Sequence, residues 1–327
     1  MKEYYFINSN NGPFMGKSDF ENIDDELGAH LICGRYNIKN KILRKFNKIH
    51  TSINLNEKFK IPFKSIWKKW DNFEKLAGKN SVFIFTDSSI RRMEFKDLKK
   101  LQEKGSSIYL VFLNTAVRPG AKYGAKMAQK IKFSKIYTID SSDAKTYKWE
   151  YTNQVYFADK INKSVKECKN DEEFDLFFVG MAKDRLNVLH DVWQKFRKFR
   201  LKFFITDVDS NAQIKDSNII YNKRISYKEV IKYIEKSNCI LEVVQGVQHG
   251  LTYRIYEALC YNKKLLTNNE AVLKLPYYSE KYIQYFKNVE DINIDFVLER
   301  TCVDYHYNDE YSPRHLVDRI KHNEGDL

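Results

Sequence analysis

The feature of this sequence that most constrains its fold is a repeated alternation of short apolar runs with longer stretches of helical spacing. In the first half, runs rich in β-branched and aromatic residues occupy residues 4–7, 81–85, 107–113 and 135–139. Between them, residues 94–104 carry apolar side chains at helical spacing, and residues 119–130 also predict a helix. Alternating strands and helices of this length predict a mainly parallel sheet flanked by helices.

The alternation restarts after a polar, charged segment at residues 159–173, which we interpret as a linker. Strands are predicted at 174–179, 202–206, 218–221, 239–244 and 263–267, and helices at 185–198, 226–237, 252–261 and 291–299. Ser226 and Glu229 have the spacing of a capping box, which predicts a helix start. A chain of 327 residues, 43% of them hydrophobic, can bury two cores. The expected fold class is therefore α/β, with two doubly wound domains that face each other across a cleft.

Net charge and cysteine usage limit the partners and the compartment. The 56 Lys and Arg exceed the 43 Asp and Glu by thirteen, which favours anionic partners: phosphorylated substrates, an anionic membrane surface or nucleic acid. Each basic run also fits a solvated helix face. Five widely spaced cysteines with no CxxC pair predict neither a disulfide framework nor a zinc site, and so a cytoplasmic setting. With no signal peptide and no run long enough to span a bilayer, membrane contact would be peripheral.

Two strand-to-helix turns could bind a phosphate. In the first, an apolar strand ends at Gly180, and Lys183 and Arg185 follow at a helix start. A glycine lets a ligand approach the backbone, and a helix start offers N–H groups and the positive end of a dipole. The alternative interpretation is a tight turn with two solvated cations.

The second turn follows the apolar run ILEVV, and its helix opens near Thr252 with Arg254 in the first turn. Arg254 and Glu257 lie three residues apart and share a helix face. A cation at the helix start suits a diphosphate, and a carboxylate one turn later can accept hydrogen bonds from ribose. The alternative is an ion pair on a surface helix, with His249 an ordinary loop histidine.

Three stretches of the sequence resemble GT-B glycosyltransferases, above all bacterial proteins of lipopolysaccharide, capsule or exopolysaccharide synthesis. YRIYEALCYNKKLLTNN, from residue 253, is similar to their R-x-x-E-A-L-x-x-G-K stretch, DLFFVGMAKDR to their D-x-x-F-x-G-x-x-x-x-R turn, and YTIDSSDAKTYKW to a segment of their first domain. The resemblance spans about residues 107–288. It departs from the family at two positions: His249 stands where many retaining members have glutamate, and Asn262 replaces the usual glycine.

The resemblance implies a GT-B fold of two Rossmann-like domains. An acceptor-side domain would cover residues 1–160 and a nucleotide-sugar-binding domain residues 170–310, with a helix at 311–327 that packs back on the first. It implies transfer of a sugar from a nucleotide-sugar donor to a glycan or lipid-linked acceptor in bacterial surface polysaccharide synthesis. Arg254 would contact donor phosphate and Glu257 the ribose. The full set of expected donor-binding residues is Gly180, Lys183, Arg185, Gln248, Gly250, Thr252, Arg254 and Glu257.

A transferase also needs a base for the acceptor hydroxyl, and Asp140, Asp87 and His249 are the candidates. Asp140 follows the strand at 135–139, where it would equally serve as the N-cap of a helix at 141–147. Asp87 follows the strand at 81–85 and is an equally placed candidate. The triplet Asp207-Val-Asp209 resembles a metal-binding D-x-D, but we expect neither a metal nor a cofactor, because cations and a helix dipole can stabilise a leaving diphosphate.

Alternative functions remain open at the level of sequence. A GT-B-fold sugar-nucleotide epimerase would share the donor site and need no acceptor. A non-catalytic glycosyltransferase partner subunit would keep the fold without donor affinity. Nucleic acid is not an expected partner, because no recognisable binding module is present. Serine hydrolase, zinc protease, P-loop and dinucleotide-dehydrogenase motifs are also missing from the sequence. The expected location is cytoplasmic, peripheral at the inner face of the membrane.

Overall fold

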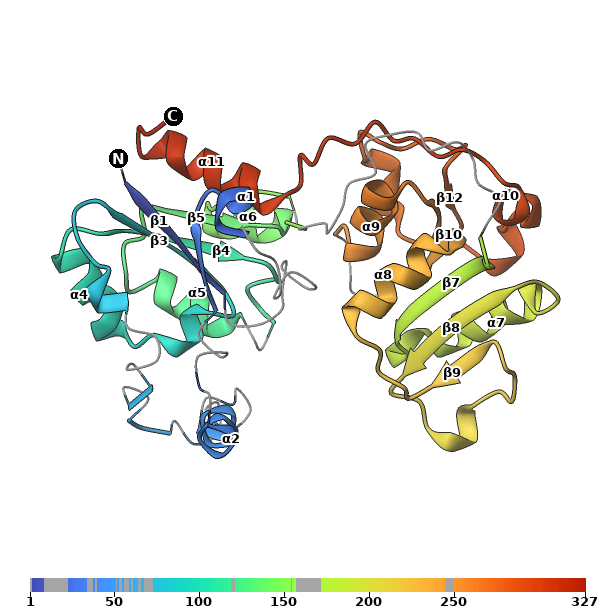
Figure 1. The fold of residues 1–327 in the computed structure, drawn as a ribbon, viewed down its shortest axis with the longest axis horizontal. Coiled ribbons are helices and arrows are strands. Elements are labelled where there is room, and N and C mark those ends of the chain that lie inside the picture. The colour runs from blue at the N-terminus through green and yellow to red at the C-terminus, as the bar shows by residue number, and fades with distance from the viewer. Residues whose placement is uncertain are drawn as a thin grey trace. The chain divides into compact units, whose positions relative to one another are not determined.

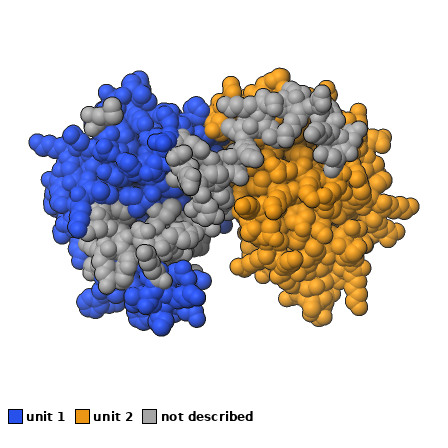
Figure 2. All heavy atoms as spheres, viewed as in Figure 1, with its two compact units in different colours: residues 1–157, 311–327 blue, residues 158–310 orange. Residues whose placement is uncertain are grey.

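The computed structural model divides the chain into two compact units, residues 1–157 with 311–327 (unit 1) and residues 158–310 (unit 2) (Figure 2). The structure describes residues 2–8, 23–33, 38, 40–50, 52, 55, 59, 61–63, 66–67, 73–118, 121–153, 155–156, 172–244 and 250–327. Each unit holds one six-stranded sheet whose neighbouring strands are all parallel (Figure 1). Two domains with parallel sheets are thus confirmed.

The sheet of unit 1 has the strand order β2-β1-β3-β4-β5-β6. Its strands are β1 Glu3–Asn8, β2 His30–Cys33, β3 Ser81–Thr86, β4 Ser107–Phe112, β5 Lys135–Thr138 and β6 Glu150–Tyr151. Its helices are α1 Ile23–Leu27, α2 Lys41–His50, α4 Phe95–Glu103, α5 Lys122–Ala128, α6 Ser141–Tyr147 and α11 Pro313–Asn323. The order reverses between β1 and β3, so their carboxyl ends flank the position where doubly wound sheets bind ligands.

Successive residues of β3 point to opposite faces of this sheet, and both faces are covered. Val82 and Ile84 pack in one apolar cluster with Val317 of α11, while Phe83 and Phe85 join a second cluster with α4 and α5. A strand buried on both faces needs a continuous apolar run, which explains why SVFIF does not alternate with polar residues. The C-terminal helix therefore belongs to the core of unit 1.

The sheet of unit 2 has the strand order β12-β11-β10-β7-β8-β9. Its strands are β7 Phe174–Met181, β8 Leu201–Thr206, β9 Ile219–Tyr221, β10 Ser237–Glu242, β11 Lys264–Thr267 and β12 Ile283–Tyr285. Its helices are α7 Leu186–Phe196, α8 Tyr227–Glu235, α9 Tyr253–Tyr261 and α10 Ile294–Leu298. Numbered along the chain this is the order 3-2-1-4-5-6, in which the dinucleotide-type crevice lies between the first and fourth strands, here β7 and β10.

Local sequence signals explain several boundaries in unit 2. The capping box predicted at Ser226 and Glu229 is present, with Ser226 as the N-cap of α8. Helix α9 ends at Asn262, whose φ of 48° is left-handed. Glycine adopts that conformation freely and Asn tolerates it better than most residues. Asn262 can therefore take the place of the glycine that the related motif usually has there.

Two expectations about unit 2 need correction. Strand β10 covers 237–242 and not 239–244, so its last residue is the charged Glu242. Cys302 forms a disulfide, contrary to the expectation that the cysteines are not cross-linked. Cys239 and Cys260 are free and buried, as their apolar surroundings predict.

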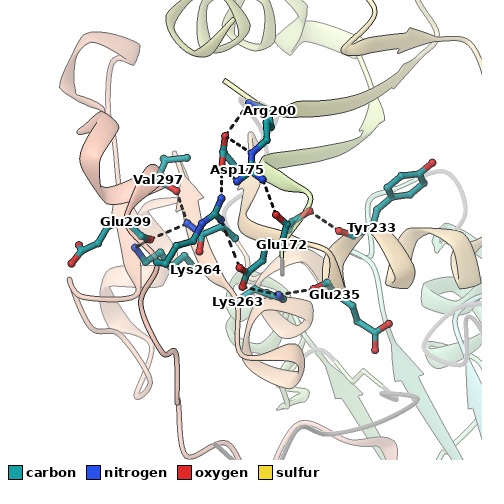
Figure 3. Close-up of polar contacts among 12 residues, drawn as sticks. Glu172, Asp175, Arg200, Tyr233, Glu235, Lys263, Lys264, Val297 and Glu299 are labelled. Atoms are coloured by element: carbon teal, nitrogen blue, oxygen red, sulfur yellow. Dashed lines mark hydrogen bonds and ion pairs between the residues drawn. The ribbon is translucent and has the colours of Figure 1, made fainter. Parts of the chain in front are cut away.

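The amino ends of the unit 2 strands hold charges that pair with one another (Figure 3). Asp175 accepts hydrogen bonds from Arg200 at 2.7 Å and from Arg300 at 2.5 Å. Lys264 Nζ donates to the carbonyl oxygens of Phe296 and Glu299, and burial lowers the pKa of Lys264. These contacts tie β7 to β8, and β11 to α10 and the residue after it, at this edge, whereas ligands of such sheets bind at the opposite, carboxyl edge.

Candidate functional site

In a sheet with this strand order, ligands bind at the carboxyl ends of the first and fourth strands, here β7 and β10, which are neighbours in the sheet. The first strand ends with Gly180 and Met181 and leads through the short 3-10 helix Lys183–Arg185 into α7. The second ends at Glu242 and leads through residues 243–251 into α9, whose N-cap is Thr252. The two turns picked out in the sequence are therefore adjacent in space.

Arg185 and Arg254 bridge these two strand ends in opposite directions. Arg185, from the turn after β7, donates to the Val243 carbonyl beyond β10, and also to Met181 O at 3.1 Å. Arg254, from α9, donates to Val179 O of β7 at 3.2 Å. Burial lowers the pKa of the Arg185 guanidinium, and the positive charge of Arg254 lowers it further. Two guanidinium groups thus lie within electrostatic reach of each other at these two strand ends.

Gly180 leaves room for one of these arginines. A Cβ atom at this position would lie 2.7 Å from Nη2 of Arg185 and 3.1 Å from the ring of Phe178. The guanidinium also sits over the Phe178 ring, 5.4 Å from its centroid. The space beside Gly180 is therefore occupied by protein. The glycine lets Arg185 cross to β10, a role different from the ligand approach expected from sequence.

Glu257 lies behind Arg254 and is 1% exposed. Its carboxylate pairs with Arg254 and accepts a hydrogen bond from Tyr227 of α8 at 2.8 Å. Burial raises the pKa of Glu257 against the opposing charge of Arg254. The i,i+3 pair foreseen as an alternative exists, but it is buried and not on a surface helix. In this arrangement the carboxylate orients Arg254.

Glu242 is a buried carboxyl group that the sequence interpretation missed. It accepts hydrogen bonds from Thr252, the N-cap of α9, and from Thr267 at 2.5 Å. Asn269 lies 3.5 Å away and also donates to Gly250 O at 3.1 Å. Burial raises the pKa of Glu242. The sequence did contain a signal for this buried carboxyl group, because Glu242 is the one ionisable residue of the apolar run ILEVV.

The remaining donor-site predictions fall on exposed residues or outside the described residues. Lys183 is exposed and has a left-handed backbone, with φ 46°. Gly250 is exposed, and a Cβ there would meet nothing within 4 Å. Gln248 and His249 lie outside the described residues. Their assignments stay predictions.

In unit 1, Asp87 lies at the position where the strand order reverses. It follows β3, whose Phe85 pairs with Ile7 of β1, and is 1% exposed. Its Oδ2 accepts a hydrogen bond from Asn114 at 2.8 Å, and its Oδ1 has no hydrogen-bond partner among the described residues. Burial raises the pKa of Asp87, although hydrogen bonds from Asn114 and from the backbone of Leu113 and Ser88, and the charge of Arg91, oppose the shift. A buried carboxyl with a raised pKa at a ligand-binding edge has the properties of a general base.

Asp140 has the local role that its sequence context also allowed. It is the N-cap of α6, and its Oδ1 accepts from the backbone N–H groups of Ser142 at 2.9 Å and Asp143 at 2.8 Å. Asp143 in turn accepts from the N–H of Ala116 at 2.6 Å, which ties α6 to the loop after β4. Asp140 therefore serves as a helix cap in this structure, whereas Asp87 does not cap a helix.

Among the described residues, no group of three or more His, Cys, Asp or Glu could hold a metal ion. Asp207 has a left-handed backbone, with φ 65°, and both it and Asp209 are exposed. In the same part of the chain, no helix combines the length and apolarity that crossing a membrane requires.

Comparison with known proteins finds likeness in structure alone. No protein-family model matches the chain, and no curated protein matches it in sequence. An α-glucosyltransferase solved with UDP and a 13-mer DNA has a TM-score of 0.51 and 11% identity, over 99% of this chain and 93% of that one. The Glycosylation Associate Protein (Gap123) complex from Streptococcus agalactiae has a TM-score of 0.45 and 11% identity, over 81% of this chain, which spans 57% of that one.

A further solved structure, a putative UDP-N-acetylglucosamine 2-epimerase from Listeria monocytogenes, has a TM-score of 0.45 and 8% identity, over 100% of this chain and 98% of that one. At such identities the likeness concerns the fold. The likeness to the α-glucosyltransferase, together with two parallel six-stranded sheets, one of them in the order 3-2-1-4-5-6, confirms the resemblance at the level of the fold. The chain has the two-domain, Rossmann-like GT-B fold.

Proposed function

We propose that this protein is a glycosyltransferase whose unit 2 binds the diphosphate of a nucleotide-sugar donor. The observation that carries the proposal is the meeting of Arg185 and Arg254 at the carboxyl ends of β7 and β10. Two neighbouring guanidinium groups repel each other, and an anion placed against both relieves that repulsion. The planar donor fork of arginine suits phosphate oxygens. The amino end of α9 adds its dipole at the same place.

These groups supply the electrostatic work of sugar transfer. When the bond between the anomeric carbon and the diphosphate breaks, negative charge grows on the departing phosphate oxygens. Arg185, Arg254 and the start of α9 stabilise that charge with groups that are already in place. Glu257 holds Arg254 from behind, so the guanidinium does not have to be ordered during the reaction. We infer that no metal or cofactor is required for this step.

In unit 1 we assign the acceptor base to Asp87. Its raised pKa makes the carboxylate a stronger base than an ordinary surface aspartate. Its Oδ1, with no hydrogen-bond partner among the described residues, is available to take the proton of an acceptor hydroxyl as that oxygen attacks the anomeric carbon. Asp140, occupied as a helix cap, is the weaker candidate.

We infer that the acceptor is a glycan or a lipid-linked sugar and that the protein works in bacterial surface polysaccharide synthesis, in the cytoplasm at the inner face of the membrane. The support is the resemblance of three sequence stretches to enzymes of that kind. The sequence fragments around Arg254, Gly180 and Asp140 carry it.

The test is nucleotide binding followed by turnover. Binding of UDP, GDP, CMP and dTDP is measured by thermal shift and calorimetry. We expect one diphosphate to bind, and Arg185→Gln to weaken it by roughly tenfold or more, since a hydrogen bond to a charged group contributes about 1.5–3 kcal/mol. The matched control is Arg197→Gln, which removes an exposed arginine just beyond α7 and should leave the affinity unchanged.

Turnover with the identified donor then separates the possible activities. Asp87→Asn should lower the transfer rate by about 10²–10⁴-fold without changing nucleotide affinity, as expected when a general base is lost. Conversion of the donor without any acceptor would instead identify an epimerase. If no nucleotide binds at any concentration tested, the proposal is wrong and a non-catalytic partner subunit is favoured.

A further inference from the structure

Helix α2 of unit 1 presents apolar side chains to solvent. Ile42, Phe46 and Ile49 are 78%, 59% and 57% exposed. Their spacing of four and then three residues places them along one line of the helix. Figure 1 shows α2 set away from the sheet of unit 1. Three large apolar side chains on one exposed helix face are unusual for a surface that meets only water.

A neighbouring segment extends this surface. His50, at the end of α2, bonds to Pro62 O at 2.7 Å and accepts a hydrogen bond from the indole of Trp67 at 2.7 Å. These contacts hold Pro62 and Trp67 beside the end of the helix. Between these two residues in the chain, Phe63 and Ile66 are 73% and 50% exposed. We call Ile42, Phe46, Ile49, Phe63 and Ile66 the α2 surface.

The chain around the α2 surface is strongly basic. Residues 34–70 contain eleven Lys or Arg and one acidic residue, Glu57, a surplus of ten out of the thirteen for the whole chain. Helix α2 itself carries four cations and no acid: Lys41, Arg44, Lys45 and Lys48. Elsewhere the positive and negative residues nearly cancel. Most of the net charge therefore falls in the stretch of sequence that contains the α2 surface.

We propose that the α2 surface docks this protein on an anionic lipid bilayer. Ile42, Phe46 and Ile49 enter the boundary between headgroups and acyl chains, while the cations of α2 contact lipid phosphates. The helix is too short and too charged to cross the bilayer, so it lies in the interface. An anionic protein partner would satisfy the charges, and nucleic acid would too. Neither accounts as well for aliphatic side chains aligned beside so many cations, an arrangement typical of interfacial helices. The proposal does not depend on the donor site in unit 2.

The test is co-sedimentation of the full-length protein with POPC vesicles and with POPC vesicles containing POPG. We expect retention on the POPG vesicles alone, weakened by added salt. The triple variant Ile42→Ser, Phe46→Ser, Ile49→Ser should lower the partition coefficient at least about tenfold, because each side chain buries apolar area on insertion. The variant Lys41→Gln, Arg44→Gln, Lys45→Gln, Lys48→Gln should remove the preference for POPG.

Matched controls come from the same unit. Val117→Ser with Leu327→Ser removes exposed apolar side chains that do not belong to α2, and Lys122→Gln, Lys126→Gln, Lys130→Gln, Lys132→Gln removes four exposed cations. Both should bind vesicles like the parent protein. Because the substituted side chains of α2 are exposed, melting temperatures and nucleotide binding should be unchanged, which separates this proposal from the donor-site proposal.

Three outcomes would overturn the docking proposal. One is equal retention of the triple serine variant on POPG vesicles, and another is no retention of the parent protein. The third is salt-sensitive binding to a single-stranded oligonucleotide that is lost in the cation variant while vesicles bind neither protein, which would identify α2 as a nucleic-acid surface.

Discussion

Glu242 shows how a single buried residue can organise the edge of a sheet. Its carboxyl group joins the N-cap of α9 to the end of β11, and Asn269 links the same group to the loop at Gly250. Burial raises its pKa, so folding favours the protonated form. We regard Glu242 as a positioning residue for the start of α9.

The raised pKa predicts the sign of a pH effect. Because the folded state holds this proton more tightly than the unfolded state, the stabilisation is complete below the unfolded pKa and is lost as pH rises through the folded one. Glu242→Gln, which cannot ionise, should reduce the fall in unfolding free energy on the alkaline side of pH 4.5, measured by urea denaturation over a pH series. The control Glu235→Gln changes an exposed carboxyl of α8. If Glu242→Gln had the same pH dependence of unfolding free energy as the parent protein, the carboxyl group of Glu242 would not be the source of that dependence.

At the scale of elements, the turn between a strand and the following helix decides which carboxylates are available for chemistry. Asp140 and Asp87 follow parallel strands of the same sheet. Asp140 begins α6 and is used as its cap, whereas no α-helix starts directly after Asp87. A sequence pattern of an aspartate after an apolar run could not separate them, because both satisfy it. The two hydrogen bonds that Asp140 accepts from the α6 backbone distinguish it from Asp87.

Asp140→Asn tests this assignment. Asn caps helices about as well as Asp but cannot act as a base. Its melting temperature and transfer rate should therefore stay near those of the parent protein. Asp140→Ala, which removes the cap, should cost about 1 kcal/mol of stability, measured by denaturant unfolding. A large loss of turnover in the Asn variant would transfer the base assignment from Asp87 to Asp140.

At the scale of the whole molecule, the chain returns to its first unit to complete it. Leu316, Val317 and Ile320 of α11 pack in the same cluster as Tyr4 and Val82. Glu324, just beyond the helix, accepts hydrogen bonds from Tyr109 and Lys2. Unit 1 therefore needs residues from both ends of the chain, and a truncation after unit 2 would expose one face of its sheet.

Leu316→Ala should destabilise unit 1 by about 2–5 kcal/mol, the usual cost of such a core cavity. In scanning calorimetry we expect a lower transition for unit 1, with nucleotide binding by unit 2 retained below that temperature. The control is Leu327→Ala, because Leu327 is 68% exposed. Loss of nucleotide binding together with unit 1 would contradict the independence of the two units.

The sequence by itself determined the alternation of strands and helices, the two parallel sheets and the two glycine- and cation-containing turns. Those features follow from local periodicity, turn residues and helix caps. These signals depend only on residues that are close together in the chain. The chain order alone could not determine which strands are neighbours. The placement of β10 beside β7, with 3-2-1-4-5-6 order, brought Arg185 and Arg254 together.

Tertiary structure also decided what the site residues do. It buried Glu257 behind Arg254, turned Gly180 into space for Arg185 and made Glu242 a link between α9 and β11. It left the apolar face of α2 exposed, although the sequence pattern alone would also fit a helix packed on a core. Burial and pairing arise from contacts between segments far apart in the chain, and they set the charge and orientation of each group. Residue types could therefore predict the two turns at which we propose that a phosphate binds, and only the packed sheet showed which of their side chains lie together.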